Sequence, residues 1–98
     1  MKRIVTTEGF AIWLDELKDI RGRARIQVRI KRLAAGNPGH QRNLKNGVSE
    51  LKVDVGPGYR IYYLDRGNEL VVLLCGGDKS TQSQDIQRAY ELVLGLEA

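Results

Sequence analysis

Residues 48–80 read VSELKVDVGPGYRIYYLDRGNELVVLLCGGDKS, and this stretch decides the fold class. Its first part alternates apolar with polar side chains, which is typical of a half-buried strand, and its last part is a continuous apolar run, typical of a strand buried on both faces. Gly-Pro-Gly and Asp-Arg-Gly-Asn segments between them predict tight turns. We therefore expect three successive antiparallel strands, the last of them central, at Val48–Val55, Tyr59–Leu64 and Leu70–Cys75.

Two helices are predicted before these strands. Thr6-Thr7-Glu8 offers an N-cap and an acidic first turn. One apolar stripe then recurs at helical spacing, and we expect it to face the core. Its members are Phe10, Trp13, Leu14, Leu17 and Ile20.

The segment Arg23 to Lys31 is ambiguous because basic and other residues alternate in it, as in a strand with a basic outer face. A helical stripe through Ile26, Ile30 and Leu33 competes with that interpretation, and the run from Leu33 to Pro38 is a strong helix stop. We favour a helix, joined to the first near Arg21-Gly22, with its basic side chains on the outer surface.

The two ends of the chain complete the architecture. Met1 to Thr6 is short enough for an edge strand, and residues 37–47 predict a loop with at most a short extended piece. Thr81 with Gln84 fits a capping box for a last helix that presents Ile86, Ala89, Tyr90 and Val93 on one face. The predicted fold is α+β, one domain over residues 1–98, with an N-terminal helical hairpin and a C-terminal helix packed on one face of a small antiparallel sheet.

Composition excludes several classes of protein. The chain has 98 residues with one cysteine and one histidine, too few for an internal disulfide or for a zinc site built on cysteines or histidines. No apolar run approaches the length of a membrane span, and the N-terminus lacks a signal-peptide core. We expect a cytoplasmic protein without a membrane partner, metal or cofactor.

Positive charge is concentrated in one part of the chain. The net charge is +4, yet residues 21–60 hold ten basic and two acidic side chains, a net of +8. Such a field favours a polyanionic partner, most commonly nucleic acid, although a solvated basic helix face is the alternative. The predicted RNA-binding residues are Arg23, Arg25, Arg29, Arg32, Arg42 and Lys45.

The strands also carry a candidate catalytic set. Lys52 and Arg60 flank a tight turn, so they should converge, and Lys79 follows the third strand. Cations of this kind, beside carboxylates and tyrosines, suit phosphodiester cleavage, in which a base, a positive clamp and an acid act on a ribose 2′-hydroxyl and its phosphate. The alternative is a set of salt bridges on a solvated sheet. The accompanying groups are Glu50, Asp54, Tyr59 and Tyr62, with Glu50 and Asp54 expected to point outward.

Three further features of the sequence are weak evidence for a catalytic site. Gly76 to Ser80 ends like a phosphate-binding loop but lacks two of its glycines. His40 reads as a surface or turn residue rather than a general base, and Cys75 as a small core residue rather than a nucleophile.

Together, these motifs closely resemble one known family. The segments that carry the likeness are Glu50-Leu51-Lys52, Gly56-Pro57-Gly58-Tyr59-Arg60-Ile61-Tyr62-Tyr63, Leu73 to Gln82, and Asp85-Ile86. They resemble the HigB-like branch of the RelE/ParE toxins, often labelled addiction module killer proteins. The resemblance implies a RelE-like fold and a toxin of a type II toxin–antitoxin pair.

In the ribosome-dependent nucleases of that superfamily, a basic sheet grips mRNA and cuts it by 2′-hydroxyl attack. The resemblance implies that Lys52 is a catalytic lysine, Arg60 the arginine of the Gly-Tyr-Arg motif and Lys79 the basic residue after the last strand. Asp54 and Asp85 stand where RelE has a second lysine and a tyrosine. The general base and acid therefore stay open among Glu50, Lys52 and a tyrosine hydroxyl.

The expected function is a metal-independent, ribosome-dependent mRNA endoribonuclease that blocks translation. Its implied partners are the ribosome, mRNA and a cognate helix-turn-helix antitoxin. The alternative is a non-catalytic inhibitor like the ParE branch that poisons DNA gyrase, or a plain nucleic-acid-binding module, since one fold hosts all of these activities.

Overall fold

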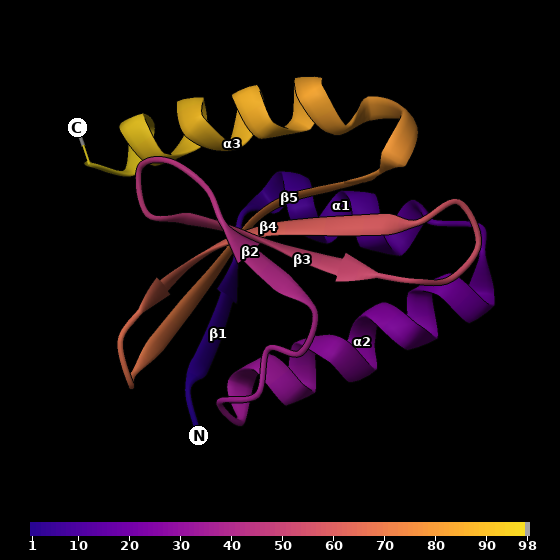
Figure 1. Cartoon of the computed structure of the whole chain (residues 1–98), viewed down its shortest axis with the longest axis horizontal. Helices are drawn as coiled ribbons and strands as arrows, with labels where there is room; N and C mark the ends of the chain where they lie inside the picture. Colours follow the sequence, from indigo (N-terminus) through magenta and orange to yellow (C-terminus); the bar gives the residue numbers. More distant parts are fainter. Residues whose placement is uncertain (98) are drawn as a thin grey trace.

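The alternating strands of residues 48–78 form the middle of the sheet in the computed structural model, which describes residues 1–97 (Figure 1). Their neighbours are two short edge strands, and three helices complete the described chain. The elements are β1 Arg3–Thr6, α1 Glu8–Glu16, α2 Ile20–Ala34, β2 Gln41–Asn43, β3 Val48–Val53, β4 Tyr59–Arg66, β5 Leu70–Asp78, a 3-10 turn Lys79–Thr81, and α3 Gln82–Glu97. No helix among these residues is long and apolar enough to cross a bilayer.

The sheet has five strands in the order β1-β5-β4-β3-β2. The predicted meander β3-β4-β5 is antiparallel, but the N-terminal strand β1 runs parallel to β5, so the sheet is mixed rather than purely antiparallel. The middle strand is β4 rather than β5, although β5 is an interior strand with buried residues on both faces. The short extended piece expected in residues 37–47 is β2, which pairs with β3.

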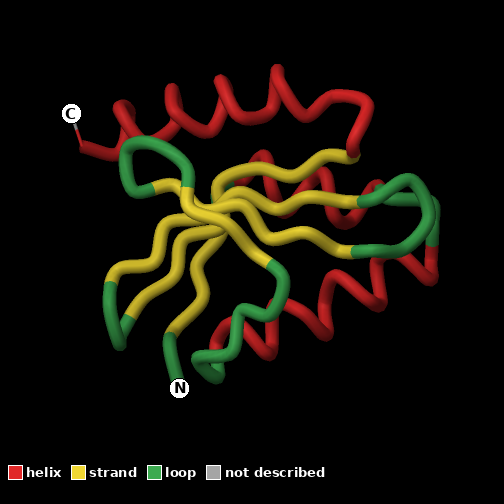
Figure 2. Tube along the Cα trace, in the orientation of Figure 1, coloured by secondary structure: helices red, strands yellow, loops and turns green. Residues whose placement is uncertain are grey.

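Helices cover both faces of this sheet, which corrects the expectation of a single covered face (Figure 2). Ile61 and Tyr63 of β4 pack with Phe10 of α1 and Ile26 of α2. Tyr62 and Leu64 of the same strand pack on the other side against α3. Because β4 is apolar at successive positions, both of its faces must be covered, and Figure 1 shows α2 and α3 on opposite sides of the sheet.

The two N-terminal helices form as predicted, but they join slightly earlier. The Thr7 hydroxyl accepts a hydrogen bond from the Phe10 amide at the start of α1. Asp19 caps α2 by accepting from the Gly22 amide, so the connection is residues 17–19 rather than Arg21-Gly22. Ile20 then falls at the first position of a new helix and is 72% exposed, outside the expected stripe.

One contact locks this connection to the sheet. The Tyr59 hydroxyl, at the start of β4, donates to Asp19 Oδ2 at 2.7 Å. Burial and the Asp19 carboxylate raise the pKa of Tyr59 to about 12, while the Gly22 amide and Tyr59 lower the pKa of Asp19. The donor and acceptor roles are therefore fixed across the neutral pH range.

The C-terminal helix presents the predicted face. Ala89 and Val93 are buried, and Ile86 and Tyr90 pack beside them. The start of the helix differs from the expected capping box, in which the Thr81 hydroxyl oxygen would accept from the Gln84 amide. The Thr81 hydroxyl instead donates to Asp85 Oδ2 at 2.6 Å. Gly77 lies so close to Asp85 that a Cβ there would collide with the carboxylate, so the helix packs directly on the β5 backbone.

The close packing of Asp19 and Tyr59 at the start of α2 predicts that an alanine substitution there will destabilise the fold. Alanine normally stabilises a helix by about 1 kcal/mol over glycine. At Gly22, however, a Cβ would lie 2.5 Å from Tyr59 Cε2 and 2.7 Å from Asp19 Oδ2. We expect Gly22→Ala to destabilise the fold by about 1–3 kcal/mol, as overpacked sites do.

Gly9→Ala in α1 is the matched control, because the nearest atom to its Cβ is Arg88 Nη2 at 3.6 Å, an ordinary contact. This control should be neutral or stabilising. Urea unfolding of both variants measures the difference, and a stabilised Gly22→Ala protein would show that the junction is not tightly packed.

Candidate active site

A cleft of about 380 Å³ opens on the α3 face of the sheet, beyond the first turn of α3. Alternation along the strands puts Glu50 and Lys52 of β3 and Arg60 of β4 on this face. The edge strand β2 forms one wall, and Gln82 of α3 closes the other side. The lining residues are His40, Gln41, Arg42, Glu50, Lys52, Arg60 and Gln82.

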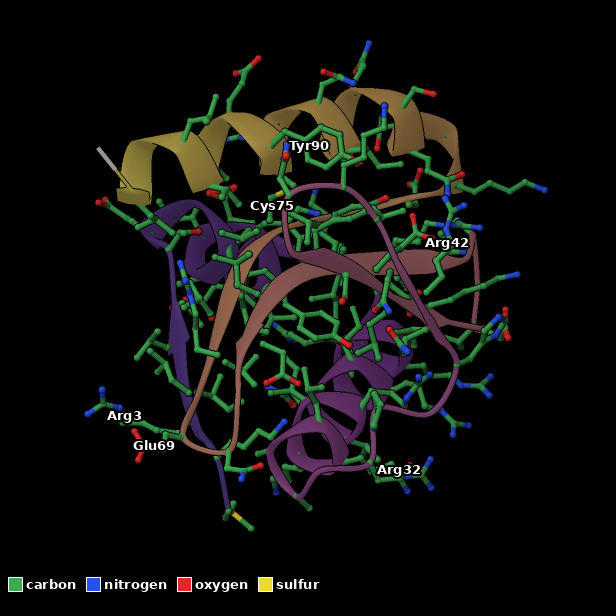
Figure 3. All side chains as sticks on the ribbon, turned by 60° about the vertical axis from the view of Figure 1, so that its left-hand side comes forward. Arg3, Arg32, Arg42, Glu69, Cys75 and Tyr90 are labelled. Atoms are coloured by element: carbon green, nitrogen blue, oxygen red, sulfur yellow. The ribbon has the colours of Figure 1, made fainter. Side chains whose placement is uncertain are left out.

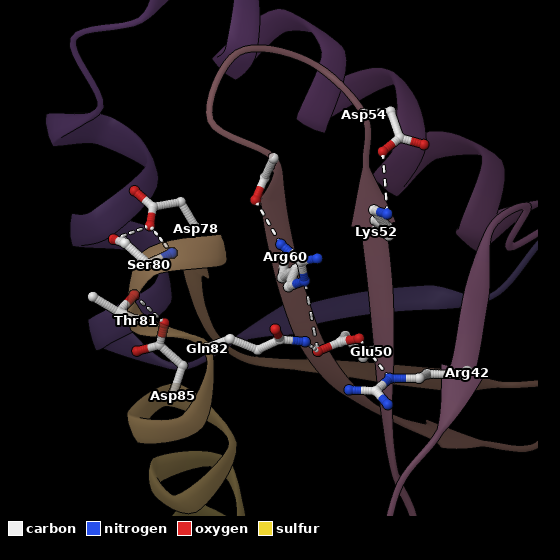
Figure 4. Close-up of polar contacts among 11 residues, drawn as sticks. Arg42, Glu50, Lys52, Asp54, Arg60, Asp78, Ser80, Thr81, Gln82 and Asp85 are labelled. Carbon is white, nitrogen blue, oxygen red and sulfur yellow. Dashed lines mark hydrogen bonds and ion pairs between the residues drawn. The ribbon is translucent and has the colours of Figure 1, made fainter.

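The structure brings Lys52 and Arg60 together as predicted, since they are direct cross-strand partners in the β3–β4 ladder. The Lys52 side chain is 37% exposed, with Nζ 3.6 Å from Asp54 Oδ1. Arg60 is buried and donates from Nη1 to the Gly58 carbonyl at 3.0 Å (Figure 4). One partly exposed cation and one buried cation thus share the floor of the cleft.

Glu50 is buried instead of pointing outward, because β2 and α3 cover it. Arg42 Nε donates to Glu50 Oε1 at 2.8 Å, and Gln82 Nε2 donates to Oε2 at 2.9 Å. Arg60 Nε lies 3.9 Å from Oε2. Burial opposes ionisation of Glu50, but the hydrogen bonds from Arg42 and Gln82 outweigh it and lower the pKa. The Glu50 carboxylate is therefore a structural anion and a poor proton acceptor.

The candidate tyrosines do not line the cleft. The Tyr62 ring is fully buried opposite Glu50, and its hydroxyl lies close enough to that carboxylate to help lower the pKa of Glu50. Burial, together with the Glu50 charge, raises the pKa of Tyr62. Tyr59 is committed to Asp19 on the opposite face. Both phenols therefore stay protonated, and neither lines the cleft.

Lys79 is near the cleft but does not line it. It is exposed in the 3-10 turn after β5, and its Cβ lies 4.0 Å from the position that a Cβ on Gly58 would take. Asp78 caps this turn by accepting from the Ser80 amide at 2.8 Å. The predicted cluster of three cations is thus two in the cleft and one beside the β3–β4 turn.

Arg29 corrects the prediction of a fully basic outer face on α2. It is 8% exposed and faces the sheet, where its guanidinium donates to the carbonyls of Lys52, Pro38 and His40 at 2.7, 2.9 and 3.3 Å. Burial lowers the pKa of Arg29. It is a structural clamp rather than an RNA contact, because its donors are turned toward backbone oxygens.

The other predicted RNA-binding residues occupy two surfaces. Arg25 and Arg32 are exposed on α2, and Arg23 is half-buried, donating to the Asp15 carbonyl. Arg42 and Lys45 are exposed on and after β2. Figure 3 shows Arg32 and Arg42 at well-separated places, so these side chains do not form one continuous patch.

His40 lines the cleft, although the sequence predicts a surface or turn residue at this position rather than a general base. Its Nδ1 lies 3.5 Å from Asp54 Oδ2. No local sequence signal could have indicated this, because the position depends on contacts with β3 and α2. Cys75, by contrast, is buried as expected, and burial raises the pKa of its thiol to about 12.

These features define a small α+β protein with a cationic cleft on a mixed five-stranded sheet. The model of the family "Phage derived protein Gp49-like (DUF891)" matches residues 12–93, and the chain belongs to this family, which is of the toxin–antitoxin type.

The chain is similar in sequence to a bacterial protein and in fold to a solved structure. An uncharacterised protein of Haemophilus influenzae is 49% identical over 96 residues, which cover 96% of this chain and 97% of that protein. The solution structure of the conserved hypothetical protein HP0894 from Helicobacter pylori matches with a TM-score of 0.50 at 20% identity, over 82% of this chain and 97% of that one. The second match is a likeness of fold alone.

The Glu50 cluster predicts a pH-dependent loss of stability. Glu50→Gln keeps the shape but leaves Arg42 and Arg60 without the carboxylate, and should cost about 2 kcal/mol at pH 7. Because the pKa of Glu50 is lowered from 4.5 in the folded chain, its contribution is present above that value and is lost as pH falls through the folded pKa. The difference in free energy of unfolding between wild type and Glu50→Gln should therefore become smaller in acid. Chemical denaturation of both proteins at pH 7 and pH 3 would measure it. An unchanged gap would show that the charge of Glu50 is unimportant.

The burial of Arg29 predicts that substitutions of two arginines in α2 will differ in their effect on the free energy of unfolding. Arg29→Met leaves three carbonyls without their donor and should lower the free energy of unfolding by about 2–3 kcal/mol. Arg25→Met, at an exposed position of the same helix, should change it by less than about 0.5 kcal/mol. Thermal unfolding of the two variants tests this, and equal stabilities would contradict the clamp.

Proposed function

We propose that this chain is the toxin of a type II toxin–antitoxin system, related to the HigB-like branch of the RelE/ParE toxins, and that it cleaves mRNA at the ribosome. The observation that carries the proposal is the cross-strand pair of Lys52 and Arg60 on the floor of an open cleft. Two adjacent cations on rigid strands suit a phosphodiester whose charge increases in the transition state.

Arg60 is the better placed of the two to stabilise the pentacoordinate phosphorane. Its guanidinium is held by the Gly58 carbonyl and lies near Glu50, so it needs little reorganisation when charge develops. Lys52, which is more exposed, orients the ribose 2′-hydroxyl and the scissile phosphate. Lys79 lies beside the β3–β4 turn, where it would meet the next phosphate along the strand.

Binding to the ribosome would use the exposed arginines. Arg25 and Arg32 of α2 lie on the opposite side of the sheet from the cleft, so they would hold rRNA rather than the scissile message. Arg42 and Lys45, on the β2 side, would contact RNA that enters the cleft. Each phosphate contact of this kind adds to the salt dependence of binding without adding sequence specificity.

The partner that this function requires is a cognate antitoxin. The family is of the toxin–antitoxin type, and a chain that cleaves its host's messages must be kept inactive. We propose a small helix-turn-helix protein in this role.

Arg60→Ala should reduce the rate of mRNA cleavage by about a hundredfold, because the lost charge acts mainly in the transition state. Lys52→Ala should also reduce it and, at a more exposed position, puts the fold at less risk. Lys18→Ala, exposed between α1 and α2, is the charge-matched control and should cleave like wild type. The measurement is primer extension on translated mRNA after induction.

Cleavage by Arg60→Ala at the wild-type rate would show that the assigned site is wrong. Intact mRNA together with accumulating cleaved DNA would instead favour the gyrase-poisoning alternative.

A further inference from the structure

We propose that His40 is the general base of this cleft, with Asp54 and Arg29 as the residues that position it. The proposal rests on the proposed nuclease function and names the group that accepts the proton from the 2′-hydroxyl. It begins from the location of His40 in the cleft lining beside Lys52 and Arg60.

The backbone of His40 is fixed from two sides. The Lys52 amide donates to the His40 carbonyl at 3.0 Å, which ties the segment before β2 to β3. From below, buried Arg29 donates to the carbonyls on both sides of Gly39, those of Pro38 and His40. Gly39 has φ +70, and a Cβ there would lie 3.1 Å from Arg29 Nη2, so the segment is shaped around the guanidinium. An exposed histidine in a loop is normally mobile, but the backbone of His40 is held in place by these hydrogen bonds.

The imidazole of His40 lies beside a carboxylate. Its Nδ1 is 3.5 Å from Asp54 Oδ2, so a proton on Nδ1 would face that carboxylate, and Nε2 is the nitrogen that we assign to accept the substrate proton. Asp54 also faces Lys52 Nζ at 3.6 Å, so one carboxylate places the imidazole and the ammonium next to each other. A carboxylate oriented in this way also stabilises the imidazolium that forms.

The carboxylate, amide and guanidinium groups that line the cleft are poor bases. Glu50 is ionised with a lowered pKa and has its oxygens engaged by Arg42 and Gln82. Glutamine amides and guanidinium groups do not accept protons near neutral pH. Imidazole is the side chain whose charge changes in that range. The charged groups that face His40 are Asp54 and Lys52 at the end of β3, Arg29 of α2, Arg42 of β2, and Glu50 and Arg60 across the cleft.

Cleavage of the phosphodiester by the 2′-hydroxyl needs no co-reactant other than water. Neutral Nε2 takes the proton of the 2′-hydroxyl as the 2′-oxygen attacks phosphorus. The bond between the 2′-oxygen and phosphorus forms, and the bond between phosphorus and the 5′-oxygen breaks, leaving a 2′,3′-cyclic phosphate. The leaving 5′-oxygen takes a proton from water in the open cleft, and the imidazolium returns its proton to solvent. Lys52 and Arg60 stay protonated throughout.

The test is the pH dependence of single-turnover mRNA cleavage at saturating ribosome, from pH 5.5 to 8.5, with wild type, His40→Gln, Asp54→Asn and the Lys18→Ala control. Wild type should become faster with rising pH and then level off. His40→Gln should be slower by about a hundredfold or more at pH 7.5 and should lose that rise. Asp54→Asn should cleave more slowly than wild type but keep the rise, because the carboxylate positions the imidazole and does not itself accept the proton.

Two further measurements separate the explanations. Thermal unfolding and ribosome pelleting should be unchanged in His40→Gln, since the side chain is 61% exposed. If His40→Gln cleaves within threefold of wild type with the same pH dependence, or loses ribosome binding but keeps the rate at saturation, the assignment is wrong while the nuclease function stands. A wild-type chain that cleaves no mRNA under these conditions contradicts both.

Discussion

The pairing of one buried carboxylate, Glu50, is the constraint on which the cleft depends. Removing this charge from water costs several kcal/mol unless donors surround it. The two donors come from separate elements, Arg42 from edge strand β2 and Gln82 from α3, and the Arg60 guanidinium of β4 lies farther away, with Nε 3.9 Å from Oε2. The hydrogen bonds from Arg42 and Gln82 outweigh desolvation and lower the pKa of Glu50. By satisfying Glu50, the fold therefore fixes the distance between β2 and α3 and sets the position of two cations.

A second buried charge, Arg29, also holds separate elements in place, on the other side of the sheet. Arg29 reaches from α2 to three backbone carbonyls, and it joins the segment before β2 to the strand that bears Lys52. The apolar cores on either face stabilise the sheet, but hydrophobic burial is non-directional and does not position a side chain to within an ångström. The directional bonds of Glu50 and Arg29 supply that precision. Ionic hydrogen bonds thus position the elements that form the walls of the cleft, and the register of β3 with β4 positions the side chains on its floor.

Sequence patterns predicted the parts of this molecule that local periodicity controls. The helices, the meander and the proximity of Lys52 to Arg60 follow from alternation, capping and one tight turn. The burial of Arg29 could not be predicted, because its surroundings in sequence are other arginines and its partners lie 9 to 23 residues away. Glu50 was expected to point outward for a related reason, since alternation distinguishes two faces but not which of them a distant helix will cover. His40 was overlooked because its place depends on both of these tertiary contacts.

In the mechanism that we propose, the proton acceptor lies at the rim of this cleft, and the properties of Glu50 give the reason. A group that organises neighbouring cations must stay ionised, and Glu50 does so because its pKa is lowered and its oxygens are engaged. The same properties make it slow to accept a proton, since protonation would break the bonds that hold Arg42 and Gln82. A base must instead gain and lose its proton in each cycle without disturbing the cations, which requires contact with solvent. His40 meets that requirement with an exposed ring on a clamped backbone. The cleft thus separates two tasks that one carboxylate could not perform together.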